Sequence, residues 1–154
     1  MTVPTSILFV CLGNICRSPL AQGVFAETAH KAGRGGDFLV DSAGTGAWHA
    51  GSQPDQRSIE VAARHGIDIT AQRARKVRPD DFSRFHLILG MDATNVADLR
   101  AQAPRGTIER VRLFLDFAGG GERDVPDPYY GGREGFENVY RMIRDASEAL
   151  LSKL

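Results

Sequence analysis

Hydrophobic and polar positions along the chain fall into two alternating kinds of segment. Short apolar runs without polar alternation are typical of strands that are buried on both faces of a parallel sheet. Residues 6–10 form such a run and predict the first strand, and the pattern recurs with strands predicted at residues 38–43, 86–90 and 111–117. Between them, apolar residues recur every three or four positions, which indicates amphipathic helices. Strands that alternate with helices favour parallel pairing through right-handed crossovers.

Helix start and stop signals divide the segments between these strands. Ser18 followed by Pro19 is typical of an N-cap and a first helical residue, and the apolar spacing continues to Gly33. Signals of the same kind predict helices at residues 54–66, 78–82, 92–103 and 136–150. The pattern therefore predicts an α/β fold in a single three-layer domain over residues 1–154. We expect a four-stranded parallel sheet flanked by helices.

Composition narrows the possible functions of this domain. The chain has 154 residues, of which 42% are hydrophobic, so it can bury a core without disulfides. Its formal net charge of +0 argues against nucleic acid as the main ligand, because binding to the phosphate backbone needs a basic excess. The N-terminus resembles no signal peptide, and no segment approaches the ~20 apolar residues of a membrane span. We therefore expect a cytoplasmic protein that binds no membrane and keeps its two cysteines, Cys11 and Cys16, reduced at rest.

The stretch VCLGNICRSP follows the first predicted strand, at the end of the sheet where α/β proteins bind their ligands. A loop at a helix N-terminus offers unpaired backbone N–H groups and a partial positive charge, and that combination binds phosphate. Gly13 and Asn14 tolerate the positive φ that a tight cradle requires, although a tight turn alone also accounts for them. Arg17 adds a planar fork that suits two phosphate oxygens. We therefore expect a phosphate-binding loop after the first strand.

Cys11 stands where the strand ends and this cradle begins. A cysteine at the end of a buried strand is often only a small hydrophobic residue. Here the positive surroundings favour its thiolate, and the hydroxyl of Ser18 can donate to the sulfur in addition to capping the helix. A thiolate at the base of a phosphate cradle is a nucleophile aimed at phosphorus. The conjunction of buried strand, cysteine, turn, arginine, serine and proline favours this second interpretation.

The loop resembles the signature of the low-molecular-weight protein tyrosine phosphatases, and the resemblance extends over essentially the whole chain. DSAGTGAWHAGSQPDQR is similar to the family's second loop, MDATN to the turn after its third strand and DVPDPYYGG to its acid loop. The resemblance implies a four-stranded parallel sheet and hydrolysis of phosphotyrosine through a cysteinyl-phosphate, without metal or cofactor. The phosphate-binding residues that it implies are Leu12, Gly13, Asn14, Ile15, Cys16, Arg17 and Ser18.

Asp127 lies between two prolines in PDPYY, which is typical of a rigid exposed turn. Taken alone, it is more simply a turn aspartate. The resemblance makes it the general acid for the leaving group and then the base that activates water. Asp92 also follows a strand end, but an N-cap explains it better. The resemblance implies that the phosphotyrosine slot is walled by Leu12, Ile15, Trp48, Tyr129 and Tyr130. His49 follows Trp48 directly, so we expect it on the rim of the slot. The two tyrosines also fit packing against the last helix.

The resemblance carries expectations for residues around the loop. Asn14, Ser18 and Ser42 match a network that supports the loop, in which many relatives have a histidine where this chain has Gln72. Because glutamine can donate and accept hydrogen bonds, that network can persist. Cys16 fits either a core filler or a resolving thiol, the redox partner that captures the oxidised nucleophile as a disulfide.

Three other functions fit parts of this pattern. Arsenate reductases of similar architecture use two distal cysteines, but no cysteine follows Cys16 in this chain. Relatives that hydrolyse phosphoarginine carry threonine at the position of Ile15, so isoleucine favours phosphotyrosine. A non-catalytic phosphate-binding module has no need of Cys11, Arg17 and Asp127 together. The expected partners are phosphotyrosine-containing proteins, with a tyrosine kinase among the candidates, and inorganic phosphate as a product inhibitor.

Overall fold

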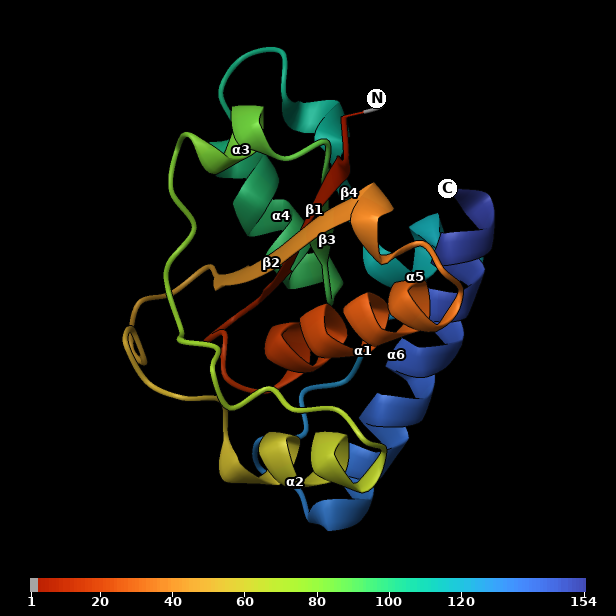
Figure 1. Cartoon of the computed structure of the whole chain (residues 1–154). Helices are drawn as coiled ribbons and strands as arrows, with labels where there is room; N and C mark the ends of the chain where they lie inside the picture. The colour runs from red at the N-terminus through yellow and green to blue at the C-terminus, as the bar shows by residue number, and fades with distance from the viewer. Residues whose placement is uncertain (1–2) are drawn as a thin grey trace.

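The structure, a computed structural model, describes residues 3–154 and places strands and helices in alternating order (Figure 1). The strands are β1 (Thr5–Cys11), β2 (Phe38–Gly44), β3 (Leu87–Gly90) and β4 (Val111–Leu113). The α-helices are α1 (Arg17–Lys31), α2 (Gln56–Arg64), α3 (Asp81–Arg84), α4 (Ala93–Gln102), α5 (Phe114–Phe117) and α6 (Arg133–Lys153). Two short 3-10 helices, η1 (Gly35–Asp37) and η2 (Ile108–Arg110), precede β2 and β4.

The strands form one parallel sheet in the order β2-β1-β3-β4. β1 pairs with β2 up to Cys11↔Gly44 and with β3 up to Val10↔Gly90. Because all strands run in the same direction, these residues meet at one edge of the sheet, where the loop after β1 begins. The predicted α/β fold, with a parallel sheet and a loop after its first strand, is confirmed.

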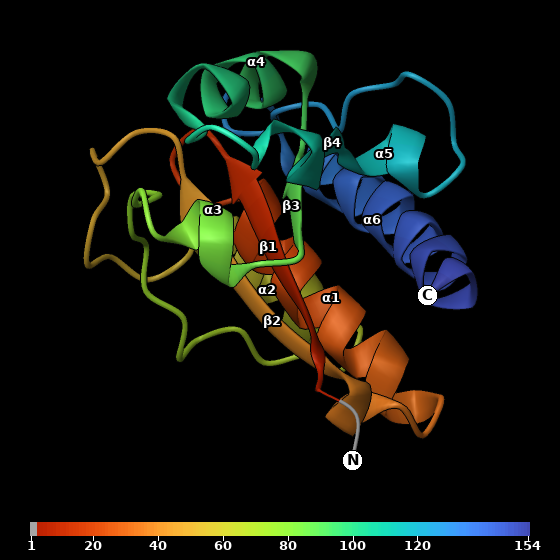
Figure 2. The same ribbon diagram turned by 90° about the horizontal axis from the view of Figure 1, so that it is seen from above.

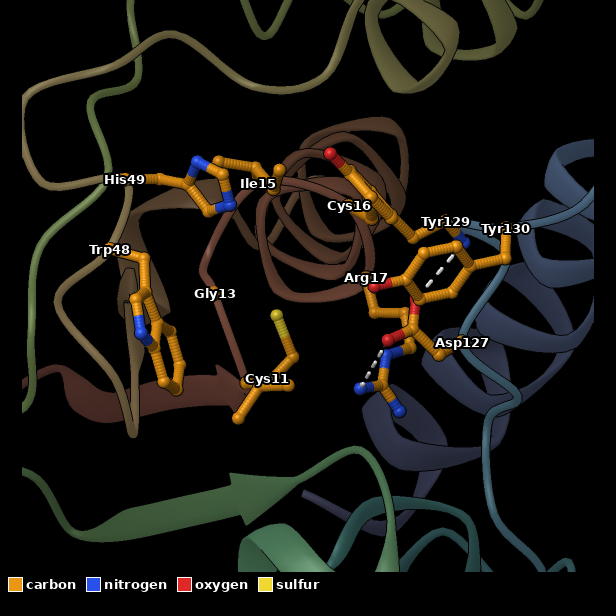
Figure 3. A pocket seen from close by; sticks show the side chains of 11 residues that line it. Cys11, Gly13, Ile15, Cys16, Arg17, Trp48, His49, Asp127, Tyr129 and Tyr130 are labelled. Atoms are coloured by element: carbon orange, nitrogen blue, oxygen red, sulfur yellow. Dashed lines mark hydrogen bonds and ion pairs between the residues drawn. The ribbon is translucent and has the colours of Figure 1, made fainter.

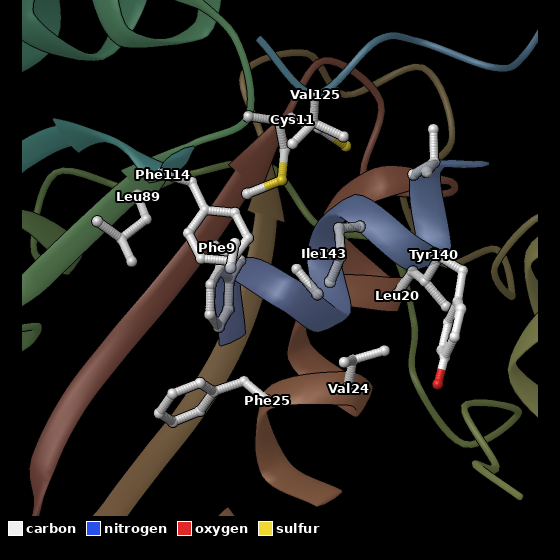
Figure 4. Packing of buried hydrophobic residues seen from close by; sticks show 14 of the residues in the cluster. Phe9, Cys11, Leu20, Val24, Phe25, Leu89, Phe114, Val125, Tyr140 and Ile143 are labelled. Atoms are coloured by element: carbon white, nitrogen blue, oxygen red, sulfur yellow. The ribbon is translucent and has the colours of Figure 1, made fainter. Parts of the chain in front are cut away.

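Helices cover both faces of this sheet (Figure 2). Successive side chains of β1 point to opposite faces, so the strand contributes to two cores. Ile7 and Phe9 join a core with α1, α2, α5 and α6, whereas Leu8 and Val10 join a core with α3 and α4. In the larger core the rings of Phe9 and Phe114 meet edge to face at 5.2 Å (Figure 4). Burial on both faces explains why the first strand is apolar without alternation.

The first helix begins earlier than its capping signal predicts. α1 starts at Arg17 with Cys16 at the N-cap position, so the prediction of Ser18 as N-cap and Pro19 as first helical residue is wrong. The Ser18 hydroxyl contacts groups of the preceding loop and is not used as a cap. Pro19 still lies in the first turn, where its missing N–H breaks no helical hydrogen bond.

The last apolar run divides into two elements. β4 covers only Val111–Leu113 and α5 follows at once, so the predicted strand over residues 111–117 is wrong in its second half. Phe114 and Leu115 are buried in the larger core. Apart from Arg112 and Asp116, the run VRLFLDF is apolar, and so short a stretch does not by its pattern alone distinguish a buried strand from a buried helical turn.

The other elements lie within a few residues of their predicted positions. Asp55 caps α2 through the backbone N–H of Arg57, and the helix ends just before Gly66, which has a φ of 78°. Asp92 caps α4, as expected. α6 begins at Arg133, one turn earlier than its apolar pattern indicates. Within residues 3–154, no helix combines the length and hydropathy needed to cross a membrane.

Candidate active site

The signature loop, defined as residues Cys11–Ser18, turns the chain from the end of β1 into α1 (Figure 3). Within residues 3–154, Asn14 is the one non-glycine residue in the left-handed region, with a φ of 56°. Asparagine tolerates this conformation better than most residues, which explains its place at the tightest point of the turn. Among the hydrogen bonds of the described chain, none is donated by a backbone N–H of residues 12–17. These groups at a helix N-terminus are therefore available to an anion.

The side chain of Asn14 fixes the loop from inside. Its Nδ2 donates to Ser18 Oγ at 2.8 Å and to Ser42 Oγ at 2.9 Å. Its Oδ1 accepts from the backbone N–H of Arg75 at 3.0 Å. Asn14, Ser18 and Ser42 are all buried, so water does not compete for these bonds. The structure therefore brings the three predicted support residues together.

Gln72 does not take part in this network. Its Nε2 donates to the Pro19 carbonyl at 3.0 Å, and its buried Oε1 has no partner among residues 3–154. Ser42 donates instead to Gln22 Oε1 at 2.8 Å. The network of Asn14, Ser18 and Ser42 therefore persists, with Gln22 rather than Gln72 as the acceptor for Ser42. Gln22 lies four residues after Ser18 on α1. That spacing places the two side chains on the same face of the helix, and it is the sequence signal that could have identified Gln22 as a neighbour of the network.

The sulfur of Cys11 lies at the base of the loop. It is 3.0 Å from Ser18 Oγ, and the residue is only 2% exposed. Because Ser18 Oγ already accepts from Asn14, its own hydrogen is free to point at the sulfur. The alternative acceptor, the Ala43 carbonyl, lies farther away at 3.4 Å. A hydroxyl in this place can stabilise negative charge on the sulfur.

Arg17 is 3% exposed and is held by two hydrogen-bond acceptors and a second carboxylate. Its Nη1 donates to Asp92 Oδ2 at 2.6 Å and to the Val125 carbonyl at 3.0 Å, and its Nη2 lies 3.6 Å from Asp127 Oδ2. Burial opposes the guanidinium charge, but negative charge at Cys11, Asp92 and Asp127 outweighs burial and raises the pKa of Arg17 above its usual value. The guanidinium is therefore charged and fixed in direction.

Asp92 uses its two oxygens for two different groups. Its Oδ1 accepts from the backbone N–H of Asn95 at 2.7 Å, and Asn95 Oδ1 accepts in return from the Asp92 N–H at 3.2 Å. This capping box confirms the predicted N-cap. Its Oδ2 holds Arg17, a contact that the sequence analysis missed. Asp92 follows β3, the neighbour of β1, and this shared edge of the sheet is the signal that points to the contact.

The aspartate loop, defined as residues Pro126–Gly132, brings Asp127 to the same cavity. Asp127 Oδ1 accepts from the backbone N–H of Tyr129 at 3.1 Å, which is the turn expected of an aspartate between prolines. The other oxygen faces Arg17, and the side chain is 40% exposed. A carboxylate in partial contact with water thus lies opposite the signature loop (Figure 3).

A cavity of about 310 Å³ joins these groups. It is lined by Cys11, Leu12, Gly13, Ile15, Cys16, Arg17, Trp48, His49, Asp127, Tyr129 and Tyr130 (Figure 3). All five predicted wall residues line it, as does His49, the predicted rim residue. Trp48 is 71% exposed and Tyr130 is 94% exposed, whereas Ile15 is 9% exposed. Trp48 and Tyr130 therefore form an open rim, and Ile15 lies deeper.

Two glycines let aromatic rings of the rim approach the backbone closely. A Cβ added to Gly46 would lie 1.8 Å from Trp48 Cζ3, so the indole packs directly on the glycine backbone. A Cβ added to Gly13 would lie 3.0 Å from His49 Cδ2. A side chain at Gly46 would displace the indole, and His49 would have to shift slightly for one at Gly13. These glycines help to shape the rim.

Cys16 lies beside the cavity as a protonated thiol. Burial raises its pKa to about 12, and negative charge at Asp55 and Cys11 adds to the effect. Both cysteines of the described chain are free. At neutral pH the Cys16 sulfur is therefore a poor nucleophile.

Amide donors, a guanidinium, a thiol and a carboxylate surround this cavity, and transfer of a phosphoryl group to sulfur requires these groups. Among residues 3–154, no three His, Cys, Asp or Glu side chains are grouped as ligands for a metal ion. The fold and the site together define a class of protein: α/β proteins whose anion-binding loop follows the first strand and carries a cysteine at its base.

Comparison with known proteins gives the family. The family model described as "Low molecular weight phosphotyrosine protein phosphatase" matches residues 6–154. The low molecular weight phosphotyrosine protein phosphatase of Schizosaccharomyces pombe is 44% identical over 156 residues, which cover 100% of this chain and 99% of the relative. The chain belongs to the low-molecular-weight phosphotyrosine protein phosphatase family and is a hydrolase.

Solved structures agree with this assignment. The crystal structure of a protein tyrosine phosphatase from Entamoeba histolytica superposes with a TM-score of 0.92 at 37% identity, covering 97% of this chain and 96% of the other. The crystal structure of YfkJ from Bacillus subtilis gives a TM-score of 0.91 at 40% identity, covering 99% and 95%. The family and the fold that the sequence predicts are therefore confirmed.

Proposed function

We propose that this enzyme hydrolyses phosphotyrosine in proteins through a cysteinyl-phosphate on Cys11, with Asp127 as general acid and then general base. One observation carries the proposal: the thiol, the fixed guanidinium of Arg17 and the carboxylate line a single cavity. The carboxylate lies 3.6 Å from that guanidinium. We further propose that residues 1–154 act as one catalytic domain.

In the first step, the phosphate group of the substrate binds the N–H groups of residues 12–18 and the guanidinium of Arg17. These donors stabilise the charge that spreads over the non-bridging oxygens in the transition state. The Cys11 sulfur forms a bond to phosphorus while the bond from phosphorus to the phenolic oxygen breaks. Asp127 gives its proton to that oxygen, so tyrosine leaves uncharged.

In the second step, the ionised Asp127 takes a proton from water as the water oxygen attacks phosphorus. The bond from sulfur to phosphorus breaks, and inorganic phosphate and the Cys11 thiolate are released. The Ser18 hydroxyl, 3.0 Å from the sulfur, supports the returning negative charge. Because phosphate binds the same loop as the substrate, we expect it to inhibit as product.

The shape of the cavity supports a protein substrate. Ile15 and Leu12 offer apolar surface to a phenyl ring whose phosphate reaches the signature loop. Trp48 and Tyr130 are exposed on the rim and can contact residues that flank a phosphotyrosine. Proteins carrying phosphotyrosine, among them a tyrosine kinase, are therefore the proposed partners, and the cytoplasm is the proposed location.

We also propose that Cys16 protects Cys11 from oxidation. Hydrogen peroxide converts the Cys11 thiolate to sulfenic acid, and attack by the Cys16 sulfur forms a disulfide and releases water. A cellular thiol then reduces the disulfide. The charge on Cys11 is one of the causes that raise the pKa of Cys16, so the two groups are within electrostatic reach. Oxidation of Cys11 to sulfenic acid removes that charge, which makes Cys16 a better nucleophile than it is in the resting enzyme. In Cys16→Ser we expect activity to persist but recovery after peroxide and reductant to fall sharply.

The test of the catalytic proposal is Cys11→Ser. Turnover of p-nitrophenyl phosphate should fall by more than about 10⁴-fold, because a hydroxyl without an adjacent base is a weak nucleophile. Inhibitor binding, measured with inorganic phosphate by calorimetry, should remain because the amides and Arg17 are unchanged. Cys16→Ser is the matched control and should keep most activity. A Cys11→Ser protein retaining a hundredth of the wild-type rate would contradict the role of Cys11.

A further inference from the structure

The first turn of α2 lies between the signature loop and the aspartate loop. On one side, the backbone N–H of Asp55 donates to the Ile15 carbonyl at 2.7 Å. Ser58 Oγ donates to the Cys16 carbonyl at 3.2 Å. These carbonyls belong to the wall of the cradle, so α2 is joined directly to the loop that is proposed to bind phosphate.

On the other side, the guanidinium of Arg57 reaches the aspartate loop. Its Nη2 donates to the Tyr129 carbonyl at 2.9 Å and its Nη1 to the Gly131 carbonyl at 3.1 Å. Its Nε and Nη2 also bond both oxygens of Asp55, at 3.0 Å and 3.1 Å. The guanidinium carbon lies 4.5 Å from the centre of the Phe136 ring. One planar side chain therefore contacts three segments of the chain at once.

The contact continues from Tyr129 to Asp127. The Tyr129 carbonyl accepts from Arg57, and the Tyr129 N–H donates to Asp127 Oδ1 at 3.1 Å. Asp127 Oδ2 then faces Arg17 (Figure 3). The direction of the Asp127 carboxylate thus depends on a residue whose own carbonyl is held by Arg57.

The aspartate loop has few other polar contacts to hold it. Its backbone bond from the Gly131 N–H to the Pro128 carbonyl, at 2.9 Å, is local to the loop. Most of its residues are exposed, so packing contributes little to its position. The Asp55 carboxylate keeps Arg57 in place: burial opposes its charge, but the bonds from Arg57 outweigh burial and lower the pKa of Asp55 below its usual value.

We propose that Arg57 is a positioning residue that fixes the aspartate loop over the signature loop and thereby aims Asp127 at the leaving-group oxygen. This inference rests on the proposed role of Asp127 as general acid. Arg57 does not touch the phosphate or the reacting atoms. Its effect is on proton transfer, which requires the carboxyl group within hydrogen-bond reach of the leaving oxygen.

The experiment compares two substrates with different leaving groups. Phenyl phosphate needs a proton on its leaving oxygen, whereas p-nitrophenyl phosphate hardly does. In Arg57→Ala, kcat for phenyl phosphate should fall by about 10- to 100-fold and kcat for p-nitrophenyl phosphate by less than about threefold. Inhibition by inorganic phosphate should stay unchanged, because that readout reports the signature loop alone.

Two further variants control for loss of folding and of charge. Arg57→Lys keeps the charge and the aliphatic stem but cannot bond the Asp55 carboxylate and two carbonyls together. We expect an intermediate loss on phenyl phosphate, and this variant decides the matter if Arg57→Ala does not fold. Arg64→Ala removes an arginine from the same helix whose side chain pairs with Glu137, at 3.2 Å, and with no other group among residues 3–154. It should leave both rates unchanged.

Asp127→Ala separates failure of this inference from failure of the proposed function. If Asp127→Ala lowers kcat equally for both substrates, the proposed acid role of Asp127 is wrong, and the inference about Arg57 is wrong with it. Suppose that Asp127→Ala lowers kcat more for phenyl phosphate than for p-nitrophenyl phosphate. If Arg57→Ala then lowers kcat equally for both substrates, or for neither, only the role of Arg57 is overturned. When Arg57→Ala is added to Asp127→Ala, kcat for phenyl phosphate should fall no further than in Asp127→Ala alone.

Discussion

The signature loop and the aspartate loop face each other across one cavity but are stabilised in opposite ways. The signature loop is fixed from within, by buried side-chain bonds of Asn14 to Ser18 and Ser42. The aspartate loop is largely exposed, with Tyr130 at 94%, and its bonds to the rest of the chain come mainly from Arg57. The part that is proposed to bind phosphate is therefore preorganised, whereas the part that is proposed to move protons is placed from outside and is easier to displace.

Asp127→Ala is the variant that should distinguish the roles of the two loops most clearly. Phenyl phosphate hydrolysis should slow by about 10²- to 10⁴-fold, because its leaving group loses its proton donor. p-Nitrophenyl phosphate should slow far less, and phosphate inhibition should persist because the signature loop is intact. The measurement is kcat for both substrates. Equal losses would mean that Asp127 only holds the shape of its loop.

The interior of the signature loop can be tested through the thiol of Cys16. Its pKa is raised to about 12, so it stays a thiol at neutral pH and becomes a thiolate only as pH rises toward that value. Alkylation of Cys16 by iodoacetamide at pH 7.5 should be about 10³-fold slower in the folded protein than in urea.

The rate should rise about tenfold per pH unit between pH 7 and 10. Mass spectrometry of a Cys11→Ser protein isolates this sulfur from its neighbour. Labelling of the folded protein as fast as in urea would show that the loop interior is open to solvent.

The link between the signature loop and β3 is tested by Asp92. Asp92→Asn keeps an acceptor for the helix cap but removes the charge that holds Arg17, so kcat/KM should fall by between about 10- and 100-fold. Asp92→Ala should lose similar activity and, in addition, about 1 kcal/mol of stability through the lost cap. Thermal unfolding of both variants separates the two effects. If Asp92→Asn is fully active, the charge of Asp92 is not needed to orient Arg17.

The smallest expected effect comes from Ile15, the residue of the signature loop whose side chain lines the cavity. Ile15→Thr removes apolar bulk from the cavity and adds a hydroxyl, so hydrolysis of phosphoarginine relative to phosphotyrosine should rise about fivefold. Phosphate inhibition reports whether the loop itself has changed. An unchanged ratio between the two substrates would show that Ile15 serves packing rather than selectivity.

The same contrast explains what the sequence could predict. The signature loop is readable because its constraints are local: strand, turn, arginine and helix occur within a few adjacent residues. Asn14 is typical of a positive φ, and Cys11 ends a strand whose burial is evident from its apolar run. Asp127 is recognisable through its flanking prolines and the resemblance of its loop.

The residues that escaped the sequence analysis act across long separations. Arg57 meets the aspartate loop more than seventy positions away, and Asp92 reaches Arg17 across the sheet edge. An aspartate that caps a helix gives no sign in sequence that its second oxygen has another use. Similarly, Ser18 matches the sequence pattern of an N-cap, but its hydroxyl contacts Cys11 and accepts a hydrogen bond from Asn14 instead of capping the helix. Local pattern identifies the element, and only tertiary contact decides among its polar partners.

The packing of Trp48 on Gly46 also gives the enzyme a built-in optical reporter. The chain contains one tryptophan, and it stands on the rim of the cavity, 71% exposed to water. Emission excited at the red edge of protein absorption therefore comes from this single indole, undiluted by any other in the chain. Its wavelength depends on how much water surrounds the ring. Occupancy of the cavity can thus be followed by fluorescence on the unlabelled protein, even in variants that no longer turn over substrate.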